Sequence, residues 1–316
     1  LRALAAQRHV ARGRVLPVTN PTDAGAPASY VDLHAHSTAS DGALAPAAAV
    51  RAAHAAGLSA FALTDHDTLA GIAEAQAQAD ALGLRLIPGV ELSVHQGGEE
   101  VHLLGLHIRD VNALQDRLEA FRGFRRRRAE QMVERLNAAS VPVTFASVLE
   151  QAAGGAIGRP HVARALVAGG WVKDLREAFD RWLGAGKPAY VDKERLEIAD
   201  GIAMIHEAGG IAVYAHPGGD GRRESIEPLV AAGLDGIEVR HPSHSREDEL
   251  RLASLAAFFG LVVSGGSDWH GAMQGGRVLG AMQVPASWLE LQVRRARERR
   301  GLGAQPHDGR QGRARH

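Results

Sequence analysis

The most constraining feature of this sequence is an apolar segment, residues 30–36, that ends in a His-x-His motif formed by His34 and His36. Residues two apart in a β-strand point to the same side of the sheet, so these two imidazoles can reach one metal ion together. A Ser-Asp-Gly turn follows and places the Asp41 carboxylate near the same end of the strand. The segment therefore predicts a metal site completed by His, Asp and Glu side chains at other strand ends.

Short apolar runs alternate with helical patterns on both sides of a central segment. Strands are predicted at residues 30–36, 58–63, 84–90, 101–108, 211–215, 236–239 and 261–264, and helices at 46–56, 69–82, 196–208, 225–232 and 246–259. This alternation indicates parallel βαβ units of the α/β class. Polar residues follow the strands, and in a barrel such strand ends gather at the face where active sites usually lie.

The central segment, residues 111–189, shows helical spacing alone. We expect one long helix to about residue 139 and shorter helices at 145–152, 160–168 and 174–183, together forming an inserted helical lid over the barrel mouth. The expected organisation is a poorly ordered leader (1–28), a barrel (29–110 and 190–287), the lid (111–189) and a basic tail (288–316).

Composition narrows the chemistry and the class of protein. The chain has no cysteine, so a metal must be held by imidazole and carboxylate groups, which suit manganese, zinc or iron. Its 36 basic and 36 acidic residues balance, which argues against a protein that binds polyanions through bulk charge. No apolar run approaches the roughly 20 residues that span a bilayer. We expect a cytoplasmic protein with no membrane contact and no stable protein partner.

Histidines at strand ends differ from the others among the sixteen in the chain. A lone histidine is usually structural or exposed, which is the expectation for His9, His54, His206, His307 and His316. Five others follow predicted strands, and three carboxylates share their edge: the set is His34, His36, His66, His216, His270, Asp41, Glu91 and Asp268. Crowding these groups without compensation is costly, and a multinuclear metal centre would supply that compensation.

At this point the chain resembles the PHP (polymerase and histidinol phosphatase) family of metal-dependent phosphoesterases. The likeness covers residues 30 to about 280 and rests on the motifs DLHAHS (32–37), SDG (40–42), TDHD (64–67), GVE (89–91), AHP (215–217) and SDWH (267–270). Two motifs of the central segment, GRPH (158–161) and GKPAY (186–190), are similar to those of the branch that contains 3′,5′-nucleoside bisphosphate phosphatases and the 5′→3′ exoribonuclease RNase AM.

The resemblance implies a distorted (β/α)7 barrel with two or three divalent ions, most simply Mn²⁺, with Zn²⁺, Fe²⁺ and Mg²⁺ as alternatives. By position, the first ion would be held by His34, His36, Glu91 and Asp268. Glu91 would bridge to a second ion held with His102 and His216. A third ion would be held by Asp41, His66 and His270. His95 and His107 are nearby alternatives to His102, but the run VHLLG (101–105) matches the branch best.

The remaining expectations concern side chains around the metals. His216, Asp268 or a metal-bound water could protonate the leaving oxygen, and Asp65 and Asp67 could orient imidazoles from behind. An equal alternative for Asp67 is the N-cap of the next helix. Arginine and lysine suit phosphate recognition, and the candidates are Arg159, Lys187 and Arg128, one of four consecutive arginines that otherwise suggest a solvated helix face. His161 and His244 could contact phosphate or cap a turn.

These features predict a phosphoesterase that removes the 3′-phosphate of 3′,5′-bisphosphorylated nucleosides such as adenosine 3′,5′-bisphosphate (pAp). A 5′→3′ exoribonuclease acting on short RNA is the main alternative, and the arginines after residue 288 could hold the RNA end. Few aromatic residues are present, which argues against a long base-stacking platform. A non-catalytic metal- or nucleotide-binding module is the alternative from another class.

Overall fold

The computed structural model describes residues 29–152, 157–192, 195–271 and 277–303. The predicted leader (1–28) and the last part of the predicted tail (304–316) lie outside the described residues. Within the described part of the chain, no helix combines the length and the apolar character that crossing a membrane requires.

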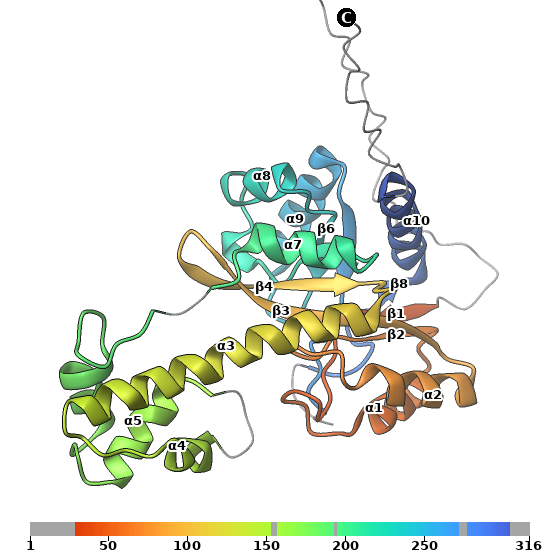
Figure 1. The fold of residues 1–316 in the computed structure, drawn as a ribbon. Helices are drawn as coiled ribbons and strands as arrows, with labels where there is room; N and C mark the ends of the chain where they lie inside the picture. Colours follow the sequence, from red (N-terminus) through yellow and green to blue (C-terminus); the bar gives the residue numbers. More distant parts are fainter. Residues whose placement is uncertain (1–28, 153–156, 193–194, 272–276, 304–316) are drawn as a thin grey trace, which may run out of the picture.

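Eight strands form one mixed sheet that curls into a nearly closed barrel (Figure 1). The strands are β1 (Tyr30–Asp32), β2 (Ala60–Leu63), β3 (Arg85–Gln96), β4 (Glu99–Leu106), β5 (Ile211–Tyr214), β6 (Gly236–Arg240), β7 (Val262–Gly265) and β8 (Val284–Pro285). Their order in the sheet is β7-β6-β5-β4-β3-β2-β1-β8. The predicted distorted barrel of strands and helices is confirmed.

Helices cover the outside of the barrel and close one of its ends. The outer helices are α1 (Pro46–Ala55), α2 (Ile72–Leu82), α7 (Ile198–Glu207), α8 (Arg223–Ala231) and α9 (Arg246–Phe259), with a 3₁₀ turn, η2 (Gly218–Asp220), before α8. The last helix, α10 (Ala286–Gly303), joins an apolar cluster with residues of the strands through Leu289 and Ala296. It lies at the side of the barrel opposite the projecting helices (Figure 1).

Local signals in the sequence explain several helix limits. Pro46 occupies the first turn of α1, where its missing N–H costs nothing. The Ser245 hydroxyl accepts from Asp248 N, and the Asp248 carboxylate accepts in return from Ser245 N, which forms a capping box at the start of α9. Gly260 then ends α9 in the left-handed conformation. The α9 limits agree with the sequence prediction residue for residue.

Strand β4 runs against its neighbours, which differs from the expected all-parallel arrangement. It pairs antiparallel with both β3 and β5, because the two-glycine turn at Gly97 and Gly98 reverses the chain directly. β3 extends to Gln96, beyond the predicted end at residue 90. The long β3–β4 hairpin therefore reaches out above the barrel mouth, and β8 adds an antiparallel edge strand that the sequence did not predict.

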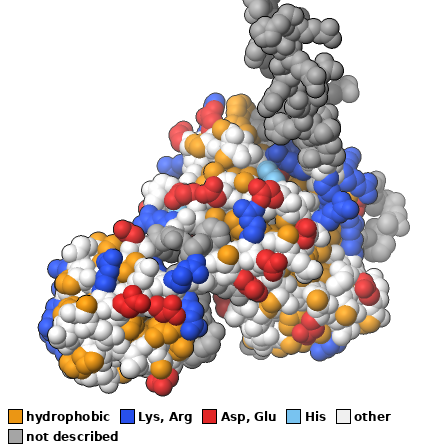
Figure 2. Space-filling view, viewed as in Figure 1, with side chains coloured by type: hydrophobic (Ala, Val, Ile, Leu, Met, Phe, Trp, Pro, Cys, Tyr) orange, Lys and Arg blue, Asp and Glu red, His pale blue; other side chains and the backbone are white. Residues whose placement is uncertain are grey.

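The central segment is helical as predicted and has a hydrophobic core of its own. It contains α3 (Val111–Ala138), α4 (Phe145–Ala152), α5 (Arg159–Ala168), α6 (Leu175–Ala178) and η1 (Phe179–Leu183), a π-helical turn where one continuous helix was predicted. Met132, Leu136 and Leu166 are among the buried side chains of this core. α3 carries the group outward from the barrel, so the segment forms a smaller lobe (Figures 1 and 2). Its role as a lid stays a prediction.

Arginines of α10 are bound to the end of the barrel opposite the predicted site. Arg299 Nε lies 2.6 Å and Arg295 Nη1 3.6 Å from the fully buried carboxylate of Asp235, which precedes β6. Arg300 Nε donates to Gly209 O, just before β5. Basic side chains gather over α10 in Figure 2. These contacts give the arginines a structural role and weaken the expectation that they hold an RNA end.

The Asp235 cluster predicts an acid-sensitive contribution to stability. Burial acts to raise the pKa of the Asp235 carboxyl, but hydrogen bonds from His206, Ala212 N and Arg299 outweigh it and lower the pKa. The ionised form therefore stabilises the fold above the ordinary pKa of about 4, and this contribution is lost as pH falls through the lowered pKa. Asp235→Asn should lower the unfolding free energy at neutral pH by roughly 2–4 kcal/mol. Chemical denaturation at pH 7 and pH 3 measures the difference, which should shrink at pH 3; an unchanged difference would contradict the assignment.

Candidate metal centre

Glu91 lies at the centre of a cluster of imidazoles at the barrel mouth. Its side chain is 1% exposed and belongs to β3. One carboxylate oxygen, Oε1, is 2.8 Å from His102 Nδ1 and 2.9 Å from His216 Nε2. The other, Oε2, faces three more ring nitrogens: His34 Nε2 at 3.1 Å, His36 Nε2 at 3.2 Å and His66 Nδ1 at 3.4 Å. Five imidazoles exceed the roughly four lone pairs of one carboxylate, so hydrogen bonding alone cannot satisfy this arrangement.

The Asp268 carboxylate, just beyond β7, completes one group of potential ligands. Its Oδ1 is 3.1 Å from His36 Nε2 and 3.5 Å from His34 Nε2. One ligand atom from each of His34, His36, Glu91 and Asp268 lies within 4.8 Å of every other, and all four residues are buried. These are the residues that the sequence resemblance implied for the first ion.

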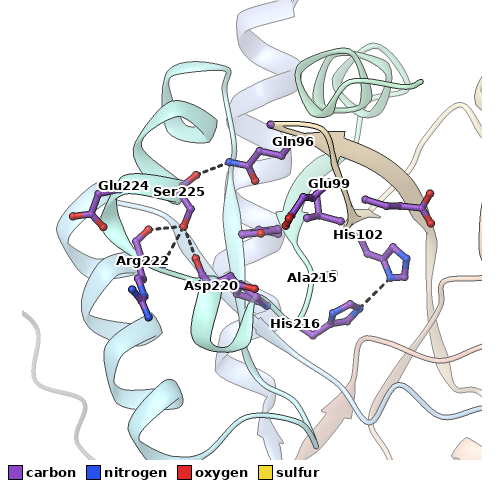
Figure 3. A pocket seen from close by; sticks show the side chains of 14 residues that line it. Gln96, Glu99, His102, Ala215, His216, Asp220, Arg222, Glu224 and Ser225 are labelled. Carbon is purple, nitrogen blue, oxygen red and sulfur yellow. Dashed lines mark hydrogen bonds between the residues drawn. The ribbon is translucent and has the colours of Figure 1, made fainter. Parts of the chain in front are cut away.

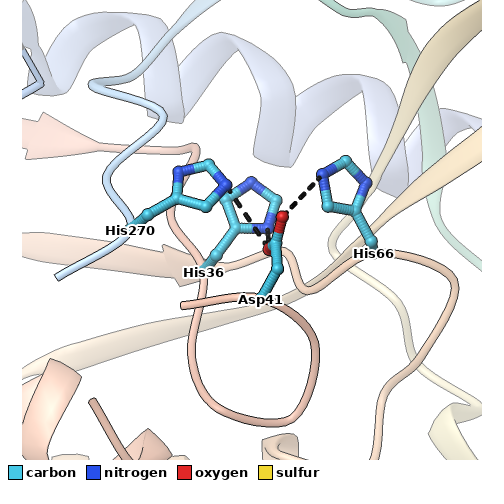
Figure 4. Close-up of side chains that lie close together, drawn as sticks. All are labelled: His36, Asp41, His66 and His270. Carbon is cyan, nitrogen blue, oxygen red and sulfur yellow. Dashed lines mark ion pairs between the residues drawn. The ribbon is translucent and has the colours of Figure 1, made fainter. Parts of the chain in front are cut away.

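A second group lies nearer the solvent, around Asp41 (Figure 4). The Asp41 carboxylate faces His270 Nε2 at 3.4 Å, His36 Nδ1 at 3.7 Å and His66 Nε2 at 3.9 Å. His270 Nδ1 donates to the Asp268 carbonyl at 2.8 Å, which leaves Nε2 turned toward Asp41. A third group contains His66, Glu91 and His102, and His216 adjoins it, with Nε2 3.3 Å from His102 Nδ1. The structure thus gathers all nine implied ligands at one mouth.

His36 tests whether the side chains fit a metal ion. Its ring is fully buried, yet neither nitrogen makes a hydrogen bond of acceptable geometry. Nε2 instead points between Glu91 Oε2 and Asp268 Oδ1, 3.2 and 3.1 Å away. Ligands held about 2.1 Å from a first-row ion are separated by roughly 3 Å. The spacing of His36 Nε2 from Glu91 Oε2 and Asp268 Oδ1 therefore fits three ligand atoms of one divalent cation.

The barrel mouth combines opposite charges at close range. Burial acts to raise the pKa of the Glu91 carboxyl, but the charge of His34 and hydrogen bonds from His102 and His216 hold it well below its usual range. Burial acts to lower the pKa of His34, but the Glu238 and Glu91 carboxylates raise it well above its usual value. Buried carboxylates that stay ionised beside imidazoles are the environment that a divalent cation requires.

Close backbone approaches hold the ligands of β1 in place. Leu33 N donates to Gly265 O and His36 N to Trp269 O, so the segment after β1 pairs with the segment after β7. A Cβ atom on Gly266 would lie 2.4 Å from the backbone nitrogen of His34, which leaves room for glycine alone. Closure of the barrel at this seam therefore sets the position of His34.

Two proposed ligands lie on unusual backbone. The φ angles of His216 and Asp268 are +26° and +49°, in a region that non-glycine residues seldom adopt. Such conformations persist where the surrounding structure fixes them, and they are frequent at functional sites. They occur shortly after β5 and β7, where the His216 side chain reaches Glu91 and the Asp268 side chain reaches His36.

The Asp65 and Asp67 carboxylates accept hydrogen bonds from backbone and hydroxyl groups. The expectation that they also orient imidazoles stays a prediction. The Asp65 carboxylate accepts from Ser37 N, Ser37 Oγ and Ser40 Oγ, each at 2.7 Å, and so shapes the loop that carries Asp41. Asp67 accepts from Ser93 N at 2.9 Å. The alternative that Asp67 caps α2 is wrong, because Gly71 occupies the N-cap position.

Two side chains of the site were missed in the sequence. Glu238, in β6, is fully buried and lies 3.0 Å from His34 Nδ1. His241 Nε2 lies 3.2 Å from Asp268 Oδ2, which Arg277 also contacts at 2.5 Å. A charged residue inside the apolar strand Gly-Ile-Glu-Val-Arg was the available signal for Glu238.

The alternatives to His102 lie elsewhere. His107 Nε2 faces Gln292 in α10 at 3.3 Å, and burial lowers the pKa of this imidazole to about 4. His95 Nε2 faces Glu100 at 3.7 Å within the β3–β4 hairpin. Only His102 of the three contacts Glu91 in the described structure, as the sequence motif implied.

The predicted phosphate-binding residues occupy the helical lobe and the β5–α9 region. His161 Nδ1 accepts from Gly158 N at the start of α5, and His244 Nε2 accepts from Gly218 N, so both imidazoles cap turns. The Arg159 guanidinium lies 5.6 Å from the centre of the Tyr190 ring, within a cation–π range. Arg128 Nε donates to Val191 O, while its Nη2 is buried without a hydrogen bond.

A pocket of about 870 Å³ opens beside His102 and His216 (Figure 3). Its walls come from the β3–β4 hairpin and from the segment that runs from the end of β5 into the first turn of α8. Gln96 links the two by donating to Ser225 O. The lining contains more acidic than basic side chains: Glu99, Glu100, Asp220 and Glu224 against Arg222. The pocket can hold a group the size of a nucleoside while disfavouring several phosphates.

Comparisons with known proteins give consistent results. The model of the PHP domain matches residues 32–191. A 3′,5′-nucleoside bisphosphate phosphatase from Chromobacterium violaceum is 41% identical over 84% of this chain and 97% of the relative, and a 5′-3′ exoribonuclease from Haemophilus influenzae is 38% identical over 82% and 92%. The crystal structure of a protein from Bifidobacterium adolescentis, thought to be a metal-dependent phosphoesterase, superposes with a TM-score of 0.62 at 34% identity, covering 85% of this chain and 97% of the other.

The choice of His102 over its neighbours predicts a difference in metal affinity. His102→Ala removes a nitrogen 2.8 Å from Glu91 and should weaken Mn²⁺ binding by about 10-fold or more. His107→Ala is the matched control: it removes a buried imidazole from the same strand–turn region and should lower thermal stability without changing Mn²⁺ affinity. Titration of free Mn²⁺ by electron paramagnetic resonance measures both. A larger effect in His107→Ala would refute the assignment.

Proposed function

Because this chain belongs to the PHP domain family, we propose that it is a metal-dependent phosphoesterase that removes the 3′-phosphate from 3′,5′-bisphosphorylated nucleosides. The observation that carries the proposal is the buried Glu91 carboxylate with five imidazoles around it. A relative named for this activity shares 41% of its residues with the chain. The enzyme is a hydrolase of phosphoric esters.

The residues at the mouth would hold two or three ions, for which Mn²⁺ suits the mixed imidazole and carboxylate donors. His34, His36, Glu91 and Asp268 would hold the first ion, Glu91, His102 and His216 the second, and Asp41, His66 and His270 the third. Bound ions supply a hydroxide at neutral pH and neutralise the phosphoryl oxygens. Glu91 holds the ligands of two positions together, while Asp268 and His216 are the two candidate side chains for the proton that the leaving oxygen needs.

Two arginines of the helical lobe support a second phosphate site. Burial lowers the pKa of Arg128, and the positive charge of Arg159 nearby lowers it further. Two like charges held close together, one with a buried Nη2 that has no hydrogen bond, favour an anionic ligand. The phosphate that is not hydrolysed would bind there, with Lys187 as a further cation on the same lobe.

The acidic pocket favours a small substrate over a long RNA. The excess of carboxylates along its walls repels a chain of phosphates, whereas a ribose and base carry no charge at neutral pH. Exoribonuclease activity remains the alternative, since relatives with that name match over 82% of the chain. A nucleotide could use the pocket in either reaction.

The first experiment compares the two activities directly. Mn²⁺-loaded protein should release phosphate from pAp much faster than it releases nucleotides from a short 5′-phosphorylated RNA. Asp268→Asn removes a proposed ligand and should abolish both reactions. Faster stepwise shortening of the RNA would make the exoribonuclease the main activity. Metal binding with neither product would favour a non-catalytic binding module.

The arginine pair predicts a substrate-dependent change in KM. Arg159→Ala and Arg128→Ala should each raise KM for pAp about 10- to 100-fold, the loss expected for a charge-assisted hydrogen bond of ~1.5–3 kcal/mol. KM for a nucleoside 3′-monophosphate should change little, because it lacks the 5′-phosphate. Lys187→Ala should act in the same direction.

Arg164→Ala is the matched control for this prediction, because Arg164 lies on α5 with Arg159 but is exposed. It should leave KM for both substrates unchanged. Equal KM changes for the bisphosphate and the monophosphate would contradict a separate site for the second phosphate.

A further inference from the structure

Glu238 is a charged side chain in a position where strands usually carry apolar ones. It is the third residue of β6, fully buried, with Ile237 and Val239 as buried neighbours. An unpaired carboxylate at such depth would be strongly destabilising. The groups that its two carboxylate oxygens contact therefore indicate the role of Glu238.

Each oxygen of Glu238 accepts from a different part of the metal centre. Oε1 lies 3.0 Å from His34 Nδ1, and Oε2 accepts from the backbone N–H of His216 at 2.8 Å. Because a carboxylate can only accept, His34 donates through Nδ1–H. His34 Nε2 is then left facing Glu91 and Asp268, 3.1 and 3.5 Å away.

The contact with His216 acts on the backbone. This residue has a φ of +26°, which a non-glycine residue adopts only when its surroundings enforce it. The hydrogen bond from its N–H to Glu238 ties the turn after β5 to β6 and directs the imidazole toward Glu91, 2.9 Å from Nε2. One carboxylate thus reaches ligands proposed for two different ions.

We propose that Glu238 is a positioning residue that fixes both His34 and His216 for metal binding. The proposal rests on the metal-dependent activity proposed above. Glu238 holds the His34 ring with Nε2 directed at the first ion, and it holds the backbone of His216 so that this imidazole meets the second. Carboxylates behind metal-binding histidines commonly act in this way, and their loss lowers metal affinity.

Replacing Glu238 by glutamine, its amide isostere, gives a sharp test, because Glu238 accepts from two donors, His34 Nδ1–H and His216 N–H. Glutamine keeps the shape but offers one carbonyl oxygen and one NH₂ group. If its oxygen accepts from His34, its NH₂ faces the His216 N–H; if its oxygen faces His216, its NH₂ meets His34 Nδ1. In either orientation one ligand loses its support, so Glu238→Gln cannot be neutral.

Asp235, which directly precedes the same strand, provides a control. It is also fully buried, and it also accepts from one imidazole, His206 Nε2 at 2.7 Å, and one backbone N–H, Ala212 at 3.0 Å. Unlike Glu238, it further accepts from the Arg299 guanidinium at 2.6 Å. Neither of those partners belongs to the metal centre. Asp235→Asn therefore reproduces the loss of a buried carboxylate without touching a proposed ligand.

The experiment measures Mn²⁺ affinity by electron paramagnetic resonance and the thermal unfolding of the metal-free protein, for the wild type and both variants. Glu238→Gln should weaken Mn²⁺ binding about 10- to 100-fold. Asp235→Asn should lower the unfolding temperature while keeping wild-type affinity. Glu238→Asp keeps the charge but is one methylene too short to reach both donors, so it should also bind Mn²⁺ less tightly; it provides the same comparison if Glu238→Gln does not fold.

Wild-type affinity in Glu238→Gln, or in Glu238→Asp where Glu238→Gln does not fold, would overturn the proposal. So would an equal loss of affinity in Asp235→Asn, because the effect would then be general destabilisation. The proposed function is judged separately, by phosphate release from the wild type. A wild type that binds Mn²⁺ but hydrolyses no ester would refute that function, while the affinity comparison would still decide the role of Glu238.

Discussion

The crowding of imidazoles around the buried Glu91 carboxylate is the interaction on which the rest of this structure depends. Five ring nitrogens approach its two oxygens within 3.4 Å, and they come from segments that lie far apart in the sequence. A barrel brings these distant segments together because the ends of successive strands meet at one mouth. The antiparallel β4 adds a nitrogen that an all-parallel barrel would place differently. His102 lies in the middle of β4, opposite Ser93 of β3, and its Nδ1 reaches Glu91.

The seam between β1 and β7 turns the curved sheet into a rigid frame for these ligands. Backbone hydrogen bonds from Leu33 and His36 cross the seam, and Gly266 permits an approach that any side chain would block. Behind the ligands, Glu238 and Asp65 accept from groups in neighbouring segments, so imidazoles and loops are held from a second layer. Rigid placement of this kind is what a site for small, highly charged ions requires.

The sequence singled out the side chains that the fold gathers at the barrel mouth because they fall in motifs at strand ends, and that they bind metal stays a prediction. His34 and His36 share one strand face, and a period of two makes that relation readable from sequence alone. Glu238 was missed because its partners, His34 and His216, are distant in sequence and only the folded sheet brings them together. The direction of β4 was missed for a related reason: alternation predicts elements, whereas pairing depends on a single two-glycine turn.

Charge is balanced in the chain as a whole but separated within the fold, and this separation fits the proposed substrate. The mouth concentrates carboxylates and imidazoles, which suit cations, while Arg128 and Arg159 lie together in a lobe with its own hydrophobic core. Holding two guanidinium groups close requires the stiffness that this core provides, because the chain would otherwise relax the repulsion. A substrate with two phosphates could bind the ions at the mouth with one and the arginines of the lobe with the other. A monoester with a single phosphate cannot bind both.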